Sequence, residues 1–215
     1  MQINARAFDE IARTVFAPIY PIIARQIVAH TGMTRGVCLD AGCGSGYLGA
    51  ALASITELHV TFFDESAEML ALAENTIKEN GLRSRTGTLQ GDIGSIALPA
   101  GSVDLVISRG SIFFWEDLPR ALREVSRILA PGGRTWIGGG FGTARLKESI
   151  RDQMAARNKG SGAFGSKIRC NLGPQMRARF EEALEQAGIA DYQIVQSDDI
   201  GLWIDIRKEG KENGP

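Results

Sequence analysis

The stretch Val37-Cys-Leu-Asp-Ala-Gly-Cys-Gly-Ser-Gly-Tyr-Leu-Gly49 decides the fold of this 215-residue chain. Its apolar start at residues 37–39 predicts a short buried strand that ends in Asp40. A turn with three alternating glycines follows, and a helical pattern resumes at Tyr47. Glycine permits a positive φ and a close approach of the backbone to a ligand, and the start of a helix offers unpaired N–H groups. The stretch therefore predicts a ligand site at the carboxyl end of a first strand.

The glycines of this turn fit two ligand-binding patterns. Gly44-Ser-Gly46-Tyr-Leu-Gly49 matches the Gly-x-Gly-x-x-Gly dinucleotide fingerprint, and Asp64 follows about 20 residues later, as that fingerprint requires. Asp40 favours another ligand, because a carboxylate ahead of the glycines repels a pyrophosphate and attracts the ammonium of an amino-acid group. A nucleotide-binding domain and a relative without a ligand stay open as alternatives.

The run Asp40-Ala-Gly-Cys-Gly-Ser-Gly46 resembles the first motif of the class I S-adenosylmethionine-dependent methyltransferases. The resemblance is dense over residues 35–140 and looser over both ends, where only the order of elements agrees. It implies that the chain binds S-adenosylmethionine and transfers its methyl group. The residues that it places at the cofactor are, in chain order, Asp40, Gly42, Cys43, Gly44, Gly46, Asp64, Glu65, Met69, Asp92, Ile93 and Ser108.

The resemblance also implies roles for three of these residues. In similar methyltransferases the acid at the tip of the second strand accepts hydrogen bonds from the ribose hydroxyls, which is the place of Asp64. The acid after the third strand binds the adenine amino group, which is the place of Asp92. Met69 would pack on the adenine by the same comparison, although plain core packing explains a methionine there equally well.

Strand and helix patterns alternate along the chain and predict an α/β fold. We expect a Rossmann-like, doubly wound sheet of about seven strands, mostly parallel, with helices on both faces. Strands are expected at residues 37–39, 58–63, 85–90, 103–107, 134–137, 192–196 and 202–207, the last two as an antiparallel hairpin. Helices are expected at 5–15 and 19–30, from Tyr47, from Ser66, from Asp117, at 144–157 and from Pro174.

The length of the chain and the lack of a separate linker-bounded domain in its sequence predict a single domain over residues 1–215. In the family that the chain resembles, leading helices cap the pocket, so residues 5–30 are expected to be cap helices, with Phe8 and Tyr20 as pocket candidates. Helices that merely cover the sheet are an equally good explanation. Residues 141–172 contain a flexible Gly/Ser segment at 158–166 and form a candidate lid over the sheet edge. A mobile surface loop without contact to substrate is the alternative for that segment.

Composition limits the partners of the chain. A net charge of −1 and a pI of about 6.2 give no sign of a nucleic acid or an anionic membrane as partner. No apolar run is long enough for a transmembrane helix, and the first residues lack the apolar core of a signal peptide. The 3 cysteines lack metal-ligand spacing, so we expect no metal and reduced thiols in a cytoplasmic protein.

The segment after the fourth strand is the candidate acceptor side of the site. Arg109 follows that strand, and its rigid guanidinium suits a carboxylate or a phosphate, so the sequence allows an anionic acceptor. A salt bridge to a local acid is an equally good explanation of Arg109. Phe113, Phe114 and Trp115 are candidates for the wall of an apolar or planar acceptor, although core packing would explain at least one of the three. Tyr20 is a further candidate on the acceptor side.

Methyl transfer from a sulfonium is an in-line displacement with a good leaving group, so the protein mainly positions the reactants and excludes water. No convincing general base is present, since His30 and His59 fit structural roles better. We therefore expect methyl transfer to a small molecule. A nucleic-acid or protein methyltransferase is the first alternative, although residues 108–111 lack the Asn/Asp-Pro-Pro-aromatic tetrapeptide of base and amide methylation. A non-catalytic module that binds a nucleoside cofactor is the second.

Overall fold

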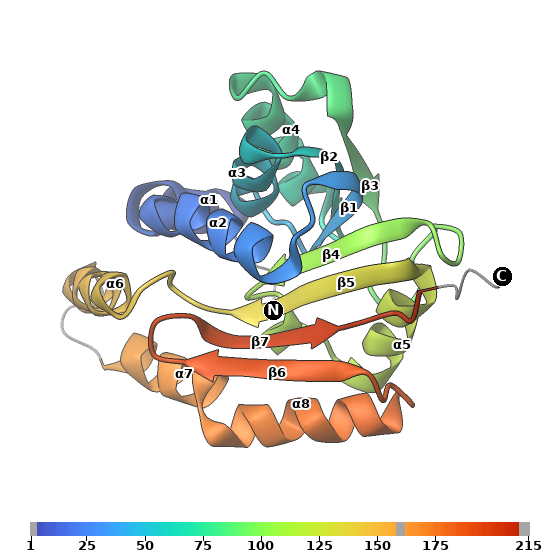
Figure 1. Ribbon diagram of the computed structural model, residues 1–215. Helices are drawn as coiled ribbons and strands as arrows, with labels where there is room; N and C mark the ends of the chain where they lie inside the picture. The colour runs from blue at the N-terminus through green and yellow to red at the C-terminus, as the bar shows by residue number, and fades with distance from the viewer. Residues whose placement is uncertain (1–3, 158–161, 211–215) are drawn as a thin grey trace, which may run out of the picture.

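The computed structural model describes residues 4–157 and 162–210 and contains one seven-stranded sheet (Figure 1). Its strands are β1 (Arg35–Ala41), β2 (Glu57–Asp64), β3 (Thr86–Gln90), β4 (Val103–Arg109), β5 (Leu129–Gly139), β6 (Tyr192–Ser197) and β7 (Gly201–Ile206). They lie in the order β3-β2-β1-β4-β5-β7-β6. The first five are parallel, while β7 is antiparallel to both β5 and β6. The predicted mostly parallel sheet with a C-terminal hairpin is confirmed.

Helices cover both faces of the sheet. They are α1 (Ala5–Ile11), α2 (Tyr20–Thr31), α3 (Tyr47–Ile55), α4 (Ala67–Glu79), α5 (Leu118–Ile128), α6 (Ala144–Arg157), α7 (Ala163–Leu172) and α8 (Pro174–Gln186). One core cluster joins the sheet to α2, α3 and α4, and the other joins it to α5 and α8. Figure 1 shows α8 running alongside β6, at the end of the sheet farthest from α4. None of the helices in the described ranges is long and apolar enough to cross a membrane.

Local sequence signals explain where the helices begin. Ser66 accepts a hydrogen bond from Met69 N at 3.3 Å and caps α4, while Asp117 accepts one from Arg120 N at 3.0 Å and caps α5. Both starts agree with the expected positions. The expected break between residues 15 and 19 is absent. Ala12–Phe16 forms a π-helical turn and Ala17–Ile19 a 3-10 turn, so α1 runs on into α2. Pro18 and Pro21 lie in first turns, where proline is tolerated.

Two further expectations need correction. The strand β5 begins at Leu129, before the Pro131–Gly133 turn signal, and a register shift between β4 and β5 accommodates these residues. The Gly/Ser segment expected to be flexible over 158–166 ends in the helix α7. Residues 158–161 lie outside the described residues. The helix forms because Phe164, Ile168 and Leu172, spaced four apart, pack on the core.

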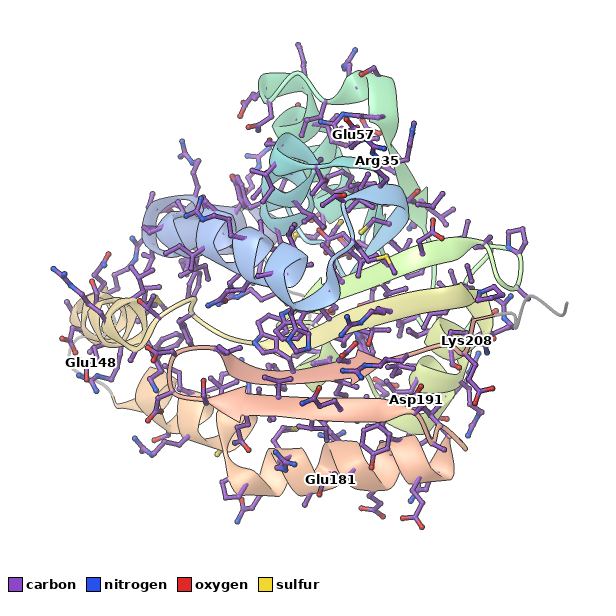
Figure 2. All side chains as sticks on the ribbon, in the orientation of Figure 1. Arg35, Glu57, Glu148, Glu181, Asp191 and Lys208 are labelled. Atoms are coloured by element: carbon purple, nitrogen blue, oxygen red, sulfur yellow. The ribbon has the colours of Figure 1, made fainter. Side chains whose placement is uncertain are left out.

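The order of the strands places a topological switch point between β1 and β4. The chain moves outward from β1 to β3 and then returns to pair β4 with the other edge of β1, with Asp40 opposite Ile107. Ligands of open α/β sheets bind at this point, outside the carboxyl ends of the strands. The amino ends of the strands, on the opposite side of the sheet, carry ordinary surface contacts. An example is the Arg35–Glu57 ion pair of 2.7 Å, whose two residues are labelled in Figure 2.

A buried charge cluster ties α2 to the far half of the sheet. Asp205 of β7 is fully buried and accepts hydrogen bonds from Arg134 Nε at 3.1 Å and Arg207 Nε at 3.2 Å. His30 Nε2 lies 3.3 Å from the same carboxylate. Arg134 also donates to the backbone oxygens of His30 and Thr31, at the end of α2. The expectation that His30 is structural agrees with this placement.

The cluster predicts a large cost for losing the Asp205 carboxylate. Asp205→Ala leaves the buried end of Arg134 without its partner, and we expect a loss of about 3–5 kcal/mol in the free energy of unfolding. Glu57→Ala is the control, because its exposed pair with Arg35 should be worth about 1 kcal/mol or less. Urea denaturation of both variants measures the difference, and equal losses would contradict the structural role of Asp205.

Candidate functional site

The glycine turn after β1 packs directly against the segment after β4. Gly42, Gly44 and Gly46 have φ values of 67°, 54° and 81°. A Cβ at Gly42 would lie 2.3 Å from the Cβ of Ser111, so any side chain there would clash. Ser111 Oγ in turn donates to Ala41 O at 3.0 Å. These contacts fix the turn at the switch point between β1 and β4.

Asp40 lies under the start of α3. The residue is 2% exposed, and its Oδ2 accepts a hydrogen bond from Gly49 N at 2.9 Å. Burial raises the pKa of this carboxyl to about 7. The hydrogen bond from Gly49 lowers the pKa, and the nearby charge of Asp64 raises it further. Its Oδ1 accepts no hydrogen bond from a described residue. One carboxylate oxygen thus remains available beside the turn.

Asp64 connects the turn to the start of α4. Its Oδ2 accepts a hydrogen bond from Gly44 N at 2.9 Å, and its Oδ1 accepts one from Ser66 N at 3.0 Å. The acid at the tip of β2 is therefore bound to backbone on both sides, which the sequence did not indicate. Next to it Glu65 is exposed. Met69 is 6% exposed on α4 and belongs to neither of the two core clusters.

The remaining cofactor candidates differ in their exposure to solvent. Asp92 is exposed and accepts a hydrogen bond from Gly94 N in the turn after β3. Ile93 is half-buried and packs on the core cluster of α5 and α8. Ser108 is fully buried, with its Oγ 2.6 Å from Ser111 Oγ. Cys43 is half-buried in the turn, and burial raises the pKa of its thiol. Ser108 therefore supports the turn through Ser111.

The start of α3 has the donors and acceptors that an amino-acid group needs. Its N-cap residue, Gly46, has no side chain, and Asp40 binds only Gly49 N of the first turn, so other backbone N–H groups are left for a carboxylate. The available oxygen of Asp40 suits an ammonium close by. Ser45 Oγ, in the same turn, is buried without a hydrogen-bond partner among the described residues. A zwitterionic amino-acid group fits these residues better than a pyrophosphate does, because Asp40 would repel the latter.

Arg109 lies at the end of β4, enclosed by aromatic rings. Its Nε donates to Gly140 O at 3.1 Å, and its Cζ lies 4.9 Å from the ring centroid of Phe16, 5.5 Å from that of Phe141 and 6.0 Å from that of Tyr20. Burial lowers the pKa of this guanidinium. No acid of the described ranges forms an ion pair with it, so the expected alternative of a local salt bridge has no support.

The N-terminal helices lie over the glycine turn. The ring of Phe8 reaches to 3.4 Å from the position that a Cβ would take on Gly44. The hydroxyl of Tyr47 donates to Asp9 Oδ1 at 2.9 Å, and the ring of Tyr20 stacks on Tyr47 at 5.5 Å. Burial raises the pKa of Tyr20, and burial together with the Asp9 hydrogen bond raises that of Tyr47 to about 12. Both pocket candidates of the sequence, Phe8 and Tyr20, thus lie beside the turn or Arg109.

Phe113 and Trp115 are not brought together with Arg109. Phe113 stacks on Phe180 of α8 at 6.2 Å, and Trp115 is 8% exposed in the same core cluster. Core packing, the alternative considered from the sequence, accounts for both residues. The rings that do approach Arg109 are Phe16 and Phe141, with Phe164 behind them at 6.2 Å and 6.4 Å. Sequence reasoning missed these three, because they come from distant segments without a shared period.

Two surface hollows lie away from this edge. One is lined by residues at the amino ends of β1 and β2, such as Thr34 and Glu57, and the other by α8 and Tyr192. Neither hollow is lined by a candidate residue. Over residues 4–157 and 162–210, no group of three or more His, Cys, Asp or Glu is placed to hold a metal ion.

Known methyltransferases are similar to this chain in sequence. Residues 39–137 match the family model described as a methyltransferase domain. The uncharacterized methyltransferase YdaC of Bacillus subtilis is 32% identical over 129 residues, which cover 59% of this chain and 69% of that protein. A malonyl-(acyl-carrier protein) O-methyltransferase of Pectobacterium atrosepticum is 39% identical over 105 residues, which cover 49% of this chain and 38% of that protein.

The similarity extends to a solved structure. A crystal structure of a Methanococcus maripaludis protein, assigned to the S-adenosyl-L-methionine-dependent methyltransferases, superimposes with a TM-score of 0.91. The two chains are 39% identical, and the match covers 100% of each.

The raised pKa of Asp40 predicts a pH-dependent stability. The folded chain holds this proton up to a pH of about 7, whereas an unfolded aspartate loses it near a pH of about 3.9. Between these values the folded state binds more protons, so the free energy of unfolding should fall as pH rises, by up to about 1.4 kcal/mol per pH unit. Asp40→Asn, which cannot ionise, should remove this slope. Denaturation curves at several pH values measure it, and parallel curves for both proteins would contradict the prediction.

Proposed function

The chain belongs to the class I S-adenosylmethionine-dependent methyltransferases, and from that premise we propose that it methylates a small molecule by in-line displacement. S-adenosylmethionine is the cofactor of this enzyme class. The observation that carries the proposal is the turn of Gly42, Gly44 and Gly46 between Asp40 and Asp64, at the switch point of the sheet.

The residues around the turn supply one partner for each polar part of the cofactor. When bound, S-adenosylmethionine supplies a methyl group on a sulfonium. In our proposal the available oxygen of Asp40 holds the ammonium, and the uncapped start of α3 holds the carboxylate. The carboxylate of Asp64 keeps lone pairs for the ribose hydroxyls beside its two backbone hydrogen bonds. Asp92 binds the adenine amino group, with Met69 and Ile93 at the ring.

Positioning and exclusion of water carry the reaction. His30 belongs to the Asp205 cluster and His59 is exposed on β2, so neither is placed as a general base for the site. The helices over residues 5–30 act as the cap. The described parts of the segment 141–172, which include α6 and α7, act as the lid. Arg157 of α6 supports this pairing of cap and lid, because its Nη2 lies 2.6 Å from Glu10 Oε1.

Cofactor choice tests the proposal directly. S-adenosylmethionine or its demethylated product should raise the melting temperature, because a ligand at 100 times its dissociation constant adds about 2.7 kcal/mol of stability. NAD should have no such effect, since Asp40 disfavours a pyrophosphate at the turn. A shift with millimolar NAD and none with the sulfonium compound would overturn the assignment.

Asp64→Asn should weaken cofactor binding while the protein stays folded. The change removes the negative charge that serves the ribose hydroxyls, and a lost charge-assisted hydrogen bond costs about 1.5–3 kcal/mol, or about 10- to 100-fold in affinity. Glu68→Gln is the control, because Glu68 is an exposed acid on the same helix start. Titration calorimetry with S-adenosylhomocysteine compares the three proteins. Equal affinities in folded Asp64→Asn and wild type would refute the ribose role.

A further inference from the structure

We infer that the methyl acceptor carries a carboxylate, which binds the terminal nitrogens of Arg109 inside its aromatic enclosure. The inference rests on the proposed function and adds the chemical class of the acceptor to it. The enclosure comprises Phe16, Tyr20, Phe141 and Phe164, as described above.

Arg109 differs from Arg85, Arg127 and Arg134, three other part-buried arginines, in having free donors. Arg85 donates to three backbone oxygens, Arg127 to two backbone oxygens and Glu124, and Arg134 to two backbone oxygens and Asp205. Arg109 donates only through Nε, to Gly140 O. Its Nη1 and Nη2 have no partner among the described residues, and neither is fully enclosed by protein. Their common edge is the fork that binds a carboxylate with two hydrogen bonds.

No acid within residues 4–157 and 162–210 forms an ion pair with Arg109. Burial lowers the pKa of its guanidinium, and the two acids whose charges reach Tyr20 have partners of their own. Asp40 accepts from Gly49 N, and Asp9 accepts from the hydroxyl of Tyr47. A guanidinium removed from bulk water without a counter-ion is costly unless a ligand supplies the negative charge. The aromatic rings recover part of that cost and keep the site poorly hydrated.

The position of Arg109 links this anion site to the proposed cofactor site. Arg109 ends β4, the strand that pairs with β1, and Asp40 of β1 lies opposite Ile107. Tyr20 lies beside this anion site, because the Arg109 Cζ is 6.0 Å from the centroid of its ring. The hydroxyl of Tyr20 makes no hydrogen bond to a described residue and can donate to an acceptor oxygen. The acceptor therefore enters between the cap helices and the end of β4.

The single charge of the enclosure favours a carboxylate over a phosphate dianion. Arg157 of α6 is paired with Glu10, and Lys167 lies over Phe114. A carboxylate is matched by Arg109 alone, whereas a dianion would leave about one charge uncompensated among aromatic rings. The three aromatic rings near the guanidinium, with Phe164 behind two of them, also suit an apolar or planar body next to the carboxylate.

The test uses acid–amide pairs, in which only the charge differs. Benzoate against benzamide, and hexanoate against hexanamide, are titrated by NMR into the full chain saturated with S-adenosylhomocysteine. Wild type should prefer each acid by about 30-fold, the size of one charge-assisted hydrogen bond. Arg109→Gln should lose the preference, and Arg109→Lys should keep part of it. The matched control Arg83→Gln removes an exposed charge at the amino edge of β3 and should behave as wild type.

Each result decides between a ligand site and a structural arginine. An acid preference that Arg109→Gln retains, or a wild type without any preference, overturns the inference. So does an Arg109-dependent preference for phenyl phosphate over benzoate, which would indicate a dianion site. An Arg109→Gln protein that melts early but keeps the acid preference makes Arg109 purely structural. Affinity for S-adenosylhomocysteine is measured in every variant. A wild-type protein that does not bind S-adenosylhomocysteine would refute the proposed function, separately from the inference about Arg109.

Discussion

The absence of a side chain at Gly42 is the constraint on which the site depends. With the Cβ position of Gly42 2.3 Å from Ser111, the turn after β1 and the segment after β4 can meet only without that atom. Their contact holds Asp40 and Arg109 on neighbouring strands at the switch point. Asp64 then fixes the same turn to α4 through Gly44 and Ser66. The turn is thus held from both sides by groups that also face the proposed ligands.

Among residues 4–157 and 162–210, the ionisable side chains of Asp205, Asp40 and Arg109 are withdrawn from water, and their partners distinguish a structural role from a ligand-binding one. Asp205 is met by Arg134, Arg207 and His30, so its charge is satisfied and the cluster serves the fold. Asp40 and Arg109 each have a single backbone partner. Unsatisfied charge of either sign is costly inside a fold, which is why both residues point to ligands of opposite charge.

The sequence predicted most of the fold because its signals are local. The Asp40–Gly46 motif, the caps Ser66 and Asp117 and the alternating strands each specify structure within a few residues. The α7 helix was missed because its apolar spacing is hidden beside a Gly/Ser-rich stretch. Tertiary contacts explain the other differences. Phe113 and Trp115 pack in the core. Phe16, Phe141 and Phe164 meet beside Arg109 only in the folded chain.

The central claim is that the glycine turn holds S-adenosylmethionine through Asp40 and Asp64. A crystal structure of the protein with S-adenosylhomocysteine tests it most directly. Our account predicts the amino-acid group at the start of α3, with its ammonium in hydrogen-bond contact with Asp40, and the ribose hydroxyls at Asp64. A cofactor bound elsewhere on the sheet, or one whose ribose and ammonium contact neither acid, would contradict it.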